Sequence, residues 1–293
     1  MTSIAILGAN GFIGRNSCLF FSEAGYSVTG LVRDQSKEEA VRENGAQPRV
    51  VDYKSVASLS DSFTGIDVVL DLVGSGWQTP DETYEESNIL NTRNIVLACQ
   101  ERNVRKFVYN SGLGVRESNS NGYFVSRFLA EKEITKTNLD YTIFRPSYII
   151  GEDDLLFLRH SKQIKSGLVN VYGSGKYRMQ PISINDVLAI YQKAIENPNH
   201  SRKIYDLVGP EVISFLEYID MISKLMNLNP KINFISLEQA MQDNMKSRDP
   251  QLSFDQLVIR ICDELSDPKR LEEIFEISLT KPQAVFDRYL KSH

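Results

Sequence analysis

The sequence has few cysteines and few histidines, and both are scattered along the chain. The 293 residues include three cysteines, Cys18, Cys99 and Cys262, and three histidines. The cysteines are far apart and odd in number, and neither residue type shows the close spacing of metal ligands. We therefore expect reduced, buried thiols, no metal site and no histidine-dependent catalytic triad.

Long hydrophobic runs and an excess of positive charge are also missing. No apolar stretch reaches the roughly 18 residues that a membrane-spanning helix needs, and no basic and then hydrophobic leader precedes the first predicted strand. The net charge of -5 argues against nucleic acid as the main partner, because phosphate binding needs a concentrated basic face. These absences predict a soluble, cytoplasmic, globular protein without a membrane span.

The chain does contain a glycine-rich turn at its start. A short apolar run, Ser3–Leu7, leads into Gly8, Gly11 and Gly14. Gly8 allows a sharp turn after a buried strand, Gly11 lets the backbone approach a pyrophosphate, and Gly14 lets a helix pack closely on the sheet. The N–H groups of that helix, predicted over Phe12–Ala24, would face the phosphates. The turn predicts a dinucleotide site formed by Gly8, Asn10, Gly11, Phe12, Ile13 and Gly14.

Short apolar runs alternate with segments of helical length through the first half of the chain. This alternation is typical of a parallel sheet covered on both faces, the doubly wound Rossmann arrangement of the α/β class. After the first strand, the predicted strands are Ser27–Val32, Gln47–Val51, Val68–Leu72, Lys106–Asn110 and Tyr141–Phe144. The segment Asp81–Glu101 is predicted to cross the sheet as one helix. A ligand is then expected beyond the carboxyl ends of the strands.

The second half has a looser pattern. A loop-rich stretch follows Gly151, and then a helix over Ile184–Ile195, opened by Asn185 or Asp186, and a strand over Lys203–Val208. From Ser214 the chain is predicted to be mainly helical, with helices over Leu216–Met226, Leu237–Asn244, Phe254–Leu265 and Pro282–Leu290. We predict a Rossmann domain over 1–153, to which 181–209 return, and a smaller, mainly helical substrate lobe over 154–180 and 210–293.

Four motifs resemble the extended and atypical branches of the short-chain dehydrogenase/reductase superfamily, which include epimerase/dehydratase-like and NmrA-like proteins. They are Gly8–Gly14, Ser87–Ile95, Arg145–Gly151 and Pro181–Val187. The tail segments Lys203–Glu211 and Arg270–Phe275 resemble the subgroup near the NADP(H)-binding accessory subunit of respiratory complex I. Because some members hold a nucleotide without known turnover, the resemblance implies the fold and the cofactor more strongly than a reaction.

The resemblance also implies a catalytic set. The superfamily uses Tyr-x-x-x-Lys on the helix after the fifth strand, and here the matching residues are Tyr123 and Arg127. Tyr123 would be the general acid or base, and Ser111 would orient a substrate carbonyl. Arg127 keeps the positive charge but has a planar fork of different reach, which puts ordinary dehydrogenase chemistry in question. Ser111 has the alternative of a serine in a glycine-rich turn, and Lys132 should face away from Tyr123.

Two residues at the end of the second predicted strand decide between the cofactors. If Arg33 points to the adenosine ribose, it can pair with a 2′-phosphate, with Lys37 as a helper, and NADP(H) is favoured. If Asp34 points there, NAD(H) is favoured. We favour NADP(H). The resemblance places Asp52 against the adenine, although Asp52 could also cap the next helix. The other predicted cofactor residues are Tyr53, Leu72, Val73, Gly74, Asn88, Tyr123, Arg127 and Pro146.

These observations predict an NAD(P)(H)-dependent oxidoreductase acting on an unidentified small molecule. The alternative is a non-catalytic NADP(H)-binding scaffold, assembly or redox-sensing protein, and a sugar-nucleotide epimerase or dehydratase is a weaker third. A homodimer through Asp81–Glu101 and Tyr123–Lys136 is possible by analogy, although core packing explains their apolar residues equally well. Candidate residues of a substrate cleft are Arg159, Arg178 and Gln180. Trp77 is a candidate to cover the cofactor site, with packing at a lobe interface as the alternative.

Overall fold

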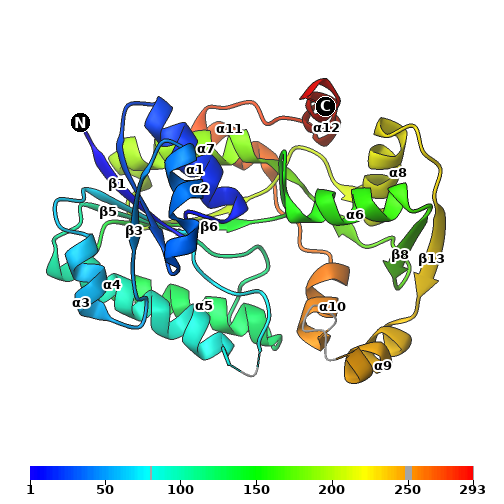
Figure 1. Ribbon diagram of the computed structural model, residues 1–293, viewed down its shortest axis with the longest axis horizontal. Coiled ribbons are helices and arrows are strands. Elements are labelled where there is room, and N and C mark those ends of the chain that lie inside the picture. Colours follow the sequence, from blue (N-terminus) through cyan, green and yellow to red (C-terminus); the bar gives the residue numbers. More distant parts are fainter. Residues whose placement is uncertain (80, 248–252, 293) are drawn as a thin grey trace. The chain divides into compact units, whose positions relative to one another are not determined.

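A computed structural model describes residues 1–79, 81–247 and 253–292 (Figure 1). The chain forms two compact units, which are described separately. The first comprises Met1–Ser75, Pro80–Arg145 and Leu188–Tyr205, and the second comprises Gly76–Thr79, Pro146–Val187 and Asp206–His293. Within the described ranges, no helix has the length and apolar character needed to cross a bilayer.

A seven-stranded sheet runs through the first unit, in the order β11-β6-β5-β4-β1-β2-β3. The pairings from β3 across to β6 are all parallel. The strands are β1 Ser3–Leu7, β2 Ser27–Val32, β3 Gln47–Val50, β4 Val68–Asp71, β5 Lys106–Asn110, β6 Tyr141–Pro146 and β11 Lys203–Leu207. Each predicted strand is present with its ends shifted by two residues or fewer, which confirms the predicted Rossmann-like α/β fold.

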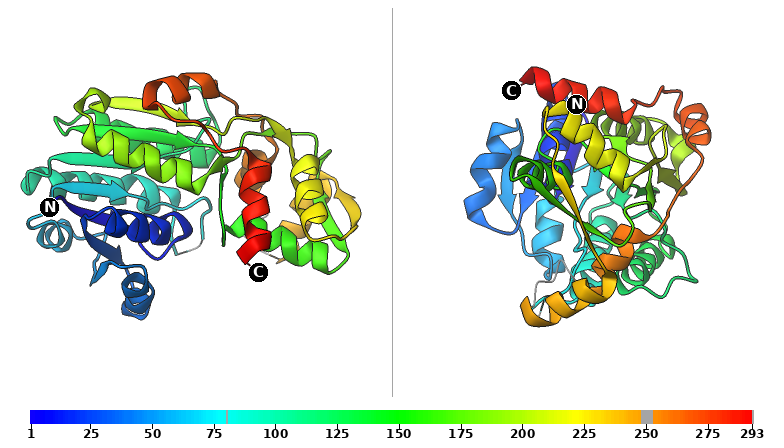
Figure 2. Two further views of the ribbon diagram at one scale, coloured as in Figure 1. Left: turned by 90° about the horizontal axis from the view of Figure 1, so that it is seen from above. Right: turned by 90° about the vertical axis from the view of Figure 1, so that its right-hand side faces the viewer.

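Helices cover both faces of this sheet. The helices α3, α4 and α5 lie on one face, and α1 and α7 lie on the other (Figures 1 and 2). Their bounds are α1 Phe12–Glu23, α2 Glu38–Glu43, α3 Val56–Ser62, α4 Asn91–Glu101, α5 Gly122–Thr135 and α7 Ile184–Glu196, with short turns η1 Gln35–Lys37, η2 Glu85–Leu90 and η3 Pro198–His200. The predicted first helix is therefore confirmed.

The main core of the first unit includes side chains from the central strands and from α3, α4 and α5. Leu7, Val69 and Phe107 have no exposed surface and belong to the same cluster as Phe63 and Ile95. Each such side chain stabilises the fold by about 1.5–3 kcal/mol through the surface it removes from water. This core holds the strand ends of the first unit in a fixed register.

The described part of the second unit contains short strand pairs and six helices. The strands β8 Leu168–Tyr172 and β13 Lys231–Ile235 pair in parallel, as Figure 1 shows. The smaller pairs are β7 Ile149–Ile150 with β10 Ile182–Ser183, and β9 Arg178–Met179 with β12 Ile213–Ser214. The helices are α6 Leu155–Lys165, α8 Phe215–Leu225, α9 Leu237–Ser247, α10 Phe254–Ile261, α11 Pro268–Phe275 and α12 Pro282–Ser292. The C-terminal region is mainly helical, as predicted.

The helix predicted over Asp81–Glu101 begins at Tyr84 instead of Asp81 and then continues without a break to Glu101, but it is not regular throughout. A π-helical turn spans Glu85–Leu90, and regular α-helix begins only at Asn91. The Thr83 hydroxyl accepts a hydrogen bond from the Glu86 N–H at 3.2 Å, and the Ser87 hydroxyl donates to the Thr83 carbonyl at 2.8 Å. These side-chain bonds start the helical segment after Thr83 and explain why the apolar spacing alone misjudged its beginning.

The loop-rich stretch predicted after Gly151 is also wrong. Asp154 accepts a hydrogen bond from the Phe157 N–H at 2.7 Å and so caps α6, and β8 follows that helix. In α7, neither predicted opening residue is the cap. The Ser183 hydroxyl accepts from the Asn185 N–H, and Asp186 instead accepts from the backbone and hydroxyl of Thr280.

The predicted helix over Phe254–Leu265 is too long, because α10 ends at Ile261. Cys262 follows in an extended conformation, with φ -81° and ψ 142°. The helix thus ends although the sequence over 262–265 contains neither glycine nor proline, the two residues that usually indicate an end.

We expect Gly14→Ala to destabilise the first unit. A Cβ at this position would lie 2.2 Å from the Gly8 carbonyl oxygen and 2.8 Å from the Ala9 Cα, and these are backbone atoms that cannot rotate away. The expected loss in the free energy of unfolding is roughly 1–3 kcal/mol, typical of an overpacked position. Urea denaturation measures it.

Gly11→Ala, in the same turn, is the matched control. Its Cβ would lie 3.3 Å from the Gly8 carbonyl oxygen, and its φ of -75° suits any residue. Because glycine is preferred over alanine at an N-cap, we expect a loss of about half to 1 kcal/mol, smaller than that of Gly14→Ala. Equal losses in the two variants would contradict the steric explanation.

Candidate functional site

The glycine turn after β1 has the geometry that the sequence predicts. Gly8 has φ +77°, which disfavours side-chain-bearing residues, and the Gly11 N–H donates to its carbonyl at 3.0 Å. A Cβ on Gly8 would also meet the Leu72 carbonyl oxygen at 3.4 Å. The turn is therefore closed tightly against the chain that leaves β4.

The N-terminus of α1 opens from this turn without a capping side chain. Gly11 is the N-cap residue, and no side chain accepts a hydrogen bond from the first helical N–H groups. Asn10 and Gly11 are exposed, whereas Phe12 and Ile13 are half-buried. An uncapped helix N-terminus carries free donors and partial positive charge, which together suit a phosphate. The residues present therefore fit a dinucleotide pyrophosphate.

Tyr53 supports the turn from below. Its ring is 4% exposed, and its hydroxyl accepts from the Gly8 N–H at 3.2 Å and donates to the Leu31 carbonyl at 3.3 Å. The hydroxyl hydrogen is thus already used within the protein. The geometry places Tyr53 as a brace beneath the glycine turn.

The carboxyl ends of the central strands lie in one row. Leu7 is opposite both Leu31 and Asp71, and Asp71 is opposite Tyr109. The residues that follow these positions therefore share the same edge of the sheet. This edge is where an open α/β sheet binds its ligand.

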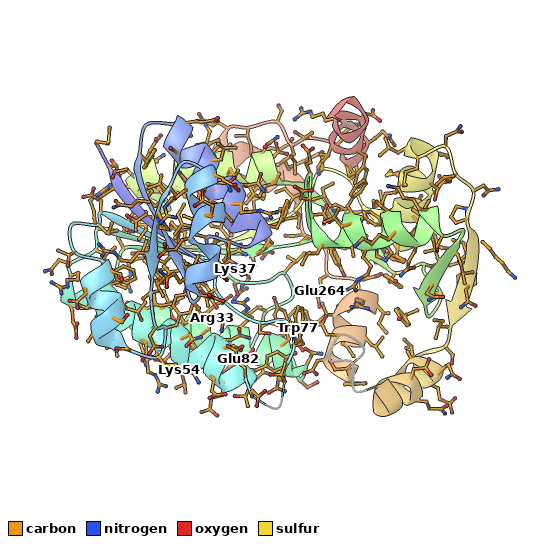
Figure 3. The ribbon with its side chains drawn as sticks, viewed as in Figure 1. Arg33, Lys37, Lys54, Trp77, Glu82 and Glu264 are labelled. Atoms are coloured by element: carbon orange, nitrogen blue, oxygen red, sulfur yellow. The ribbon has the colours of Figure 1, made fainter. Side chains whose placement is uncertain are left out.

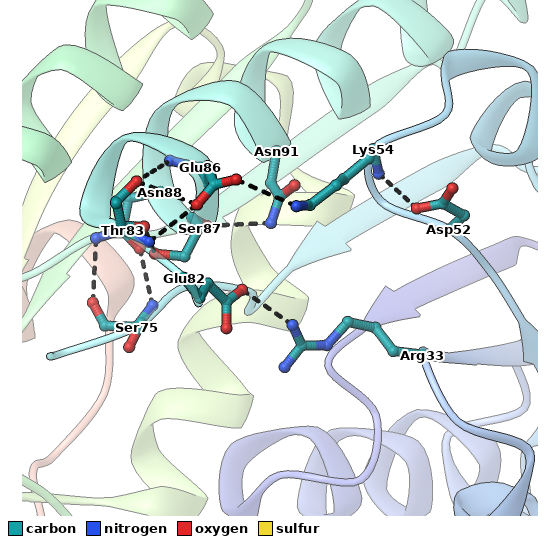
Figure 4. Close-up of polar contacts among 10 residues, drawn as sticks. All are labelled: Arg33, Asp52, Lys54, Ser75, Glu82, Thr83, Glu86, Ser87, Asn88 and Asn91. Carbon is teal, nitrogen blue, oxygen red and sulfur yellow. Dashed lines mark hydrogen bonds and ion pairs between the residues drawn. The ribbon is translucent and has the colours of Figure 1, made fainter. Parts of the chain in front are cut away.

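Arg33 and Asp34 follow β2 and have different surroundings. Figures 3 and 4 show those of Arg33. Arg33 is exposed, and its guanidinium pairs with the Glu82 carboxylate at 3.0 Å. Asp34 caps the turn η1 by accepting from the Ser36 N–H at 2.8 Å, and this bond lowers the pKa of Asp34. The Asp34 carboxylate is therefore engaged in its own turn.

Lys54 is a second cation beside the segment that contains Glu82 and Glu86. The Lys54 ammonium pairs with the Glu86 carboxylate at 3.2 Å, and the Lys54 N–H donates to Asp52 at 2.9 Å (Figure 4). Asp52 is exposed, as an adenine-contacting residue must be. The alternative that Asp52 caps α3 is wrong, because Ser55 is the N-cap and accepts from the Ser58 N–H.

The loop after β4 is pinned by Asn88. Its side-chain amide accepts from the Ser75 N–H at 2.8 Å and donates to the Ser75 carbonyl and to the Ser126 hydroxyl, at 3.1 and 2.9 Å. Asn88 has no exposed surface. It thus ties the loop that begins with Leu72, Val73 and Gly74 to α5.

Arg127 is 7% exposed and extends under the same loop. One guanidinium nitrogen, Nη1, donates to the Val73 carbonyl at 3.1 Å and to the Tyr109 hydroxyl at 3.0 Å. A Cβ on Gly74 would lie 2.3 Å from the other terminal nitrogen, so a side chain at position 74 would displace the guanidinium, and the Gly74 φ of +147° itself disfavours other residues. The guanidinium therefore braces the exposed Gly74 backbone from within the protein.

Asp71 provides a buried carboxyl group in the middle of the sheet. One carboxyl oxygen accepts from the Val73 N–H at 2.9 Å, whereas the other is buried without a partner among the described residues. Burial raises the pKa of Asp71 to about 7, despite the opposing effects of the Val73 N–H and the Arg127 charge. This group was missed in the sequence, although a charged residue inside the apolar run Val68–Val73 is a visible signal.

Tyr123 lies at the start of α5, where Asn121 caps the helix by accepting from the Tyr123 N–H at 3.1 Å. Its ring is half-buried, with the Arg127 guanidinium 5.6 Å from the ring centroid. The phenol oxygen lies near Gly112, where an added Cβ would be only 2.9 Å from it. Among the residues that the structure describes, this hydroxyl has no hydrogen-bond partner, so it remains available to a ligand.

Ser111, Glu131 and Arg145 form a chain of hydrogen bonds, which we call the strap. The Ser111 hydroxyl donates to the Glu131 carboxylate at 2.6 Å, and Arg145 holds the same carboxylate with two bonds of 2.9 and 2.6 Å. The strap connects β5, α5 and β6. Because its hydrogen is given to Glu131, the Ser111 hydroxyl is left as an acceptor in this arrangement. Glu131 was missed in the sequence because no local pattern pairs it with Arg145.

The remaining predicted residues belong to the second unit. Pro146 is half-buried at the end of β6, and Trp77 is 37% exposed. Arg178 pairs with Asp263 at 2.8 Å, and the buried Gln180 bonds to the Gly209 and Ser266 carbonyls.

The described residues include no cluster of metal-ligating side chains, and His293 lies outside them. Cys18 and Cys99 are buried, as predicted, whereas Cys262 is half-buried.

We expect Asp71→Asn to change how stability depends on pH. The pKa of Asp71 is about 7 when folded, against an ordinary value of 3.8. Between these pH values the native state holds one more proton than the unfolded chain, so its stability falls as the pH rises and levels off above about 7. The variant should lose this slope, which is worth about 4 kcal/mol at most.

Denaturation of both proteins between pH 5 and pH 8 measures the slope. Asp67→Asn is the matched control, because hydrogen bonds from Ser3 lower the pKa of Asp67 and its effect lies at lower pH. That control should keep the wild-type slope. Parallel curves for wild type and Asp71→Asn would exclude a raised pKa at Asp71.

Comparison with known proteins agrees with this geometry. The family described as NAD(P)H-binding matches residues 8–168. The mitochondrial NADH dehydrogenase (ubiquinone) 1 alpha subcomplex subunit 9 of Dictyostelium discoideum is 24% identical over 224 residues, which are 74% of this chain and 62% of that protein. The chain therefore spans less than two thirds of that relative.

Two other proteins are similar over more of their length. The NAD(P)H azoreductase of Xenophilus azovorans is 24% identical over 82% of this chain and 79% of its own. The NADPH-dependent quinone oxidoreductase of Escherichia coli, solved with NADPH, has a TM-score of 0.77 at 18% identity and covers 99% of both chains, a likeness that shows the fold. The family match over residues 8–168 makes up more than half of the sequence and contains the glycine turn, the loop after β4 and Tyr123. The chain therefore belongs to the NAD(P)H-binding family.

Proposed function

We propose that this protein is an NADPH-dependent oxidoreductase that reduces a small molecule, with Tyr123 as the proton donor. The observation that carries the proposal is the Tyr123 phenol. It lies at the carboxyl edge of the sheet beside Gly112, with no hydrogen-bond partner among the described residues and with a buried cation beside its ring. A positioned, uncommitted phenol is suited to move a proton.

The chain offers the cofactor distinct contacts along the strand ends. The uncapped N-terminus of α1 would hold the pyrophosphate, and Asp52 would face the adenine. The exposed backbone of Gly74 would lie under the nicotinamide end. Bound NADPH supplies a hydride from C4 of its nicotinamide.

The protein's own groups would handle the proton and the position of the substrate. Tyr123 would donate the phenol proton to the substrate atom that becomes negatively charged. The Arg127 guanidinium lies 5.6 Å from the centroid of the Tyr123 ring and would hold the ring in place by a cation–π contact. Arg127 would act mainly as a positioning residue, since Nη1 is bonded to the protein. Ser111 would keep Tyr123 and the end of β5 in place through Glu131.

The preference for NADPH rests on Arg33. Its exposed guanidinium is held by Glu82, and Lys54 stands nearby with Glu86 (Figure 4). A 2′-phosphate could replace the Glu82 carboxylate as the partner of Arg33. The engagement of Asp34 with Ser36 supports the same preference, because the acidic group of an NAD site must be free to accept from the ribose.

A second candidate is a non-catalytic NADPH-binding scaffold. Two observations favour it. Arg127, which occupies the position of the superfamily's lysine, is hydrogen-bonded to Val73 and Tyr109 within the protein. The Ser111 hydroxyl likewise donates to Glu131 instead of to a ligand. The similarity to a complex I subunit points the same way. An epimerase or dehydratase is less favoured, since that chemistry relies on the tyrosine and lysine pair.

Self-association and cytoplasmic location stay as proposals from the sequence. The helices α4 and α5 each carry an exposed leucine, Leu97 at 43% and Leu129 at 41%, which supports a contact between copies through these helices.

We expect the protein to bind NADPH more tightly than NADH, and Arg33→Ala to remove the difference. Loss of one charge-assisted hydrogen bond to the 2′-phosphate should weaken NADPH binding by about tenfold or more, with NADH little changed. Glu82→Gln should strengthen NADPH binding, because it removes the carboxylate that competes for Arg33. Calorimetric titration with both nucleotides measures these affinities.

Arg42→Ala is the control for this titration. Arg42 is an exposed arginine paired with Glu38 and Glu39 on α2, and its loss should leave both affinities unchanged. Tighter binding of NADH than of NADPH would overturn the cofactor preference. A protein that binds neither nucleotide would overturn the proposed function and the scaffold alternative together.

We expect Tyr123→Phe to reduce turnover by about 100-fold while NADPH affinity is kept, because the variant loses only the phenol proton. Azo dyes and quinones are the first acceptors to assay, since an azoreductase and a quinone oxidoreductase are among the similar proteins. The rate of NADPH oxidation, followed by its absorbance at increasing acceptor concentration, gives kcat and KM.

Tyr84→Phe provides the matched control. The centroid of the Tyr84 ring lies 6.4 Å from that of the Tyr123 ring. The variant removes a neighbouring phenol hydroxyl and so tests whether the loss of turnover is specific to Tyr123. If wild type and Tyr123→Phe turn over acceptors at equal rates, Tyr123 is not the proton donor. If wild type binds NADPH but reduces no acceptor, the scaffold function replaces the enzyme.

A further inference from the structure

The second unit contains a cavity of about 240 Å³ built entirely from its own residues. Residues of α6, β8 and α10 line it, and we call it the α6 pocket. Its lining includes two arginines, three tyrosines and one histidine: Arg159, Arg260, Tyr148, Tyr172, Tyr177 and His160. None of its lining residues is acidic. The pocket therefore combines positive charge with aromatic walls.

Arg260 supplies the charge that most needs a partner. It forms no ion pair with any carboxylate that the structure describes, and its guanidinium lies 5.9 Å from the centroid of the Tyr172 ring. Burial and the like charge of Arg159 lower the pKa of Arg260. Two guanidinium groups thus face the same cavity, and an anion between them would relieve both effects. Arg178, by contrast, is paired with Asp263.

His160 adds no charge at neutral pH. Its Nδ1 donates to the Leu156 carbonyl at 2.8 Å, and burial lowers its pKa to about 4. Its ring meets the Phe215 ring edge-on, with centroids 5.1 Å apart. His160 is therefore a neutral wall of the pocket, and the positive charge comes from the two arginines.

Planar aromatic rings form much of the pocket lining. The rings of Tyr177 and Phe215 stack with centroids 5.3 Å apart, and the rings of Tyr148 and Tyr172 complete the lining. Aromatic faces of this kind suit another ring, in stacked or edge-on contact. The volume lies below the range of pockets for drug-sized molecules, so the occupant must be small.

We propose that the α6 pocket binds a small aromatic anion, a single ring carrying a carboxylate or a phosphate. Arg260 and Arg159 would hold the anionic group, and the tyrosine rings would contact the ring of the ligand. The proposal does not rest on the proposed function, because no residue of the pocket belongs to the nucleotide site.

Calorimetric titration of the whole protein with benzoate, phenyl phosphate, benzamide and inorganic phosphate tests the proposal. We expect at least one aromatic anion to bind with Kd below about 1 mM. Benzamide, which has the ring without the charge, and inorganic phosphate, which has the charge without the ring, should each bind at least about tenfold more weakly. Failure of both aromatic anions to bind at about 10 mM would overturn the proposal.

Arg260→Gln and Arg159→Gln should each weaken the aromatic anion by about tenfold or more. Arg178→Gln, which removes a paired arginine from the same unit, should leave it unchanged. Unchanged NADPH affinity in all three variants shows that the first unit is intact and separates this test from that of the proposed function. If the aromatic anion binds Arg260→Gln and Arg159→Gln as tightly as wild type, the pocket is not its site.

Discussion

The guanidinium of Arg127 is the group on which the arrangement of the site depends. From α5 it reaches beneath the end of β4, where it bonds to the Val73 carbonyl and to the Tyr109 hydroxyl of β5. It thereby connects three elements at the edge where the ligand is expected. Among the residues that the structure describes, its buried Nε atom has no hydrogen-bond partner, and neither does one carboxyl oxygen of Asp71. Such unsatisfied buried groups are costly and mark places where packing alone does not explain the residues.

Arginine and lysine at position 127 would make different contacts. A lysine has a slender stem and a rotatable ammonium group that can reach a ribose, whereas a guanidinium is a rigid fork. Here the guanidinium lies directly against Gly74, where a Cβ would be 2.3 Å from its nearest nitrogen. The pair Gly74 and Arg127 therefore has to be considered together, and the loop position rather than the ribose is what the arginine holds directly. Tyr123 keeps its cationic neighbour in either case.

Much of the fold could be predicted because its signals are local. Glycines at 8, 11 and 14 and the apolar runs of the sheet each specify their own turn or strand. The errors lie where a distant or side-chain partner decides. The Thr83 hydroxyl sets the start of the helical segment before α4, and Thr280 takes the Asp186 carboxylate that would otherwise cap α7. The strap from Ser111 through Glu131 to Arg145 joins three elements, and no sequence spacing indicates it.

The charged side chains divide into those with protein partners and those without. Arg33 and Arg178 have carboxylate partners at 3.0 and 2.8 Å, yet both pairs are exposed, so exchanging the carboxylate for an incoming anion costs little. Arg260 differs, because it is half-buried and shares its cavity with another arginine and with no acid. Burying a charge without a counter-ion is tolerated when a ligand completes the site. The two proposed anion sites therefore differ in kind, because an anion would replace a carboxylate at Arg33 and would supply a missing counter-ion at Arg260.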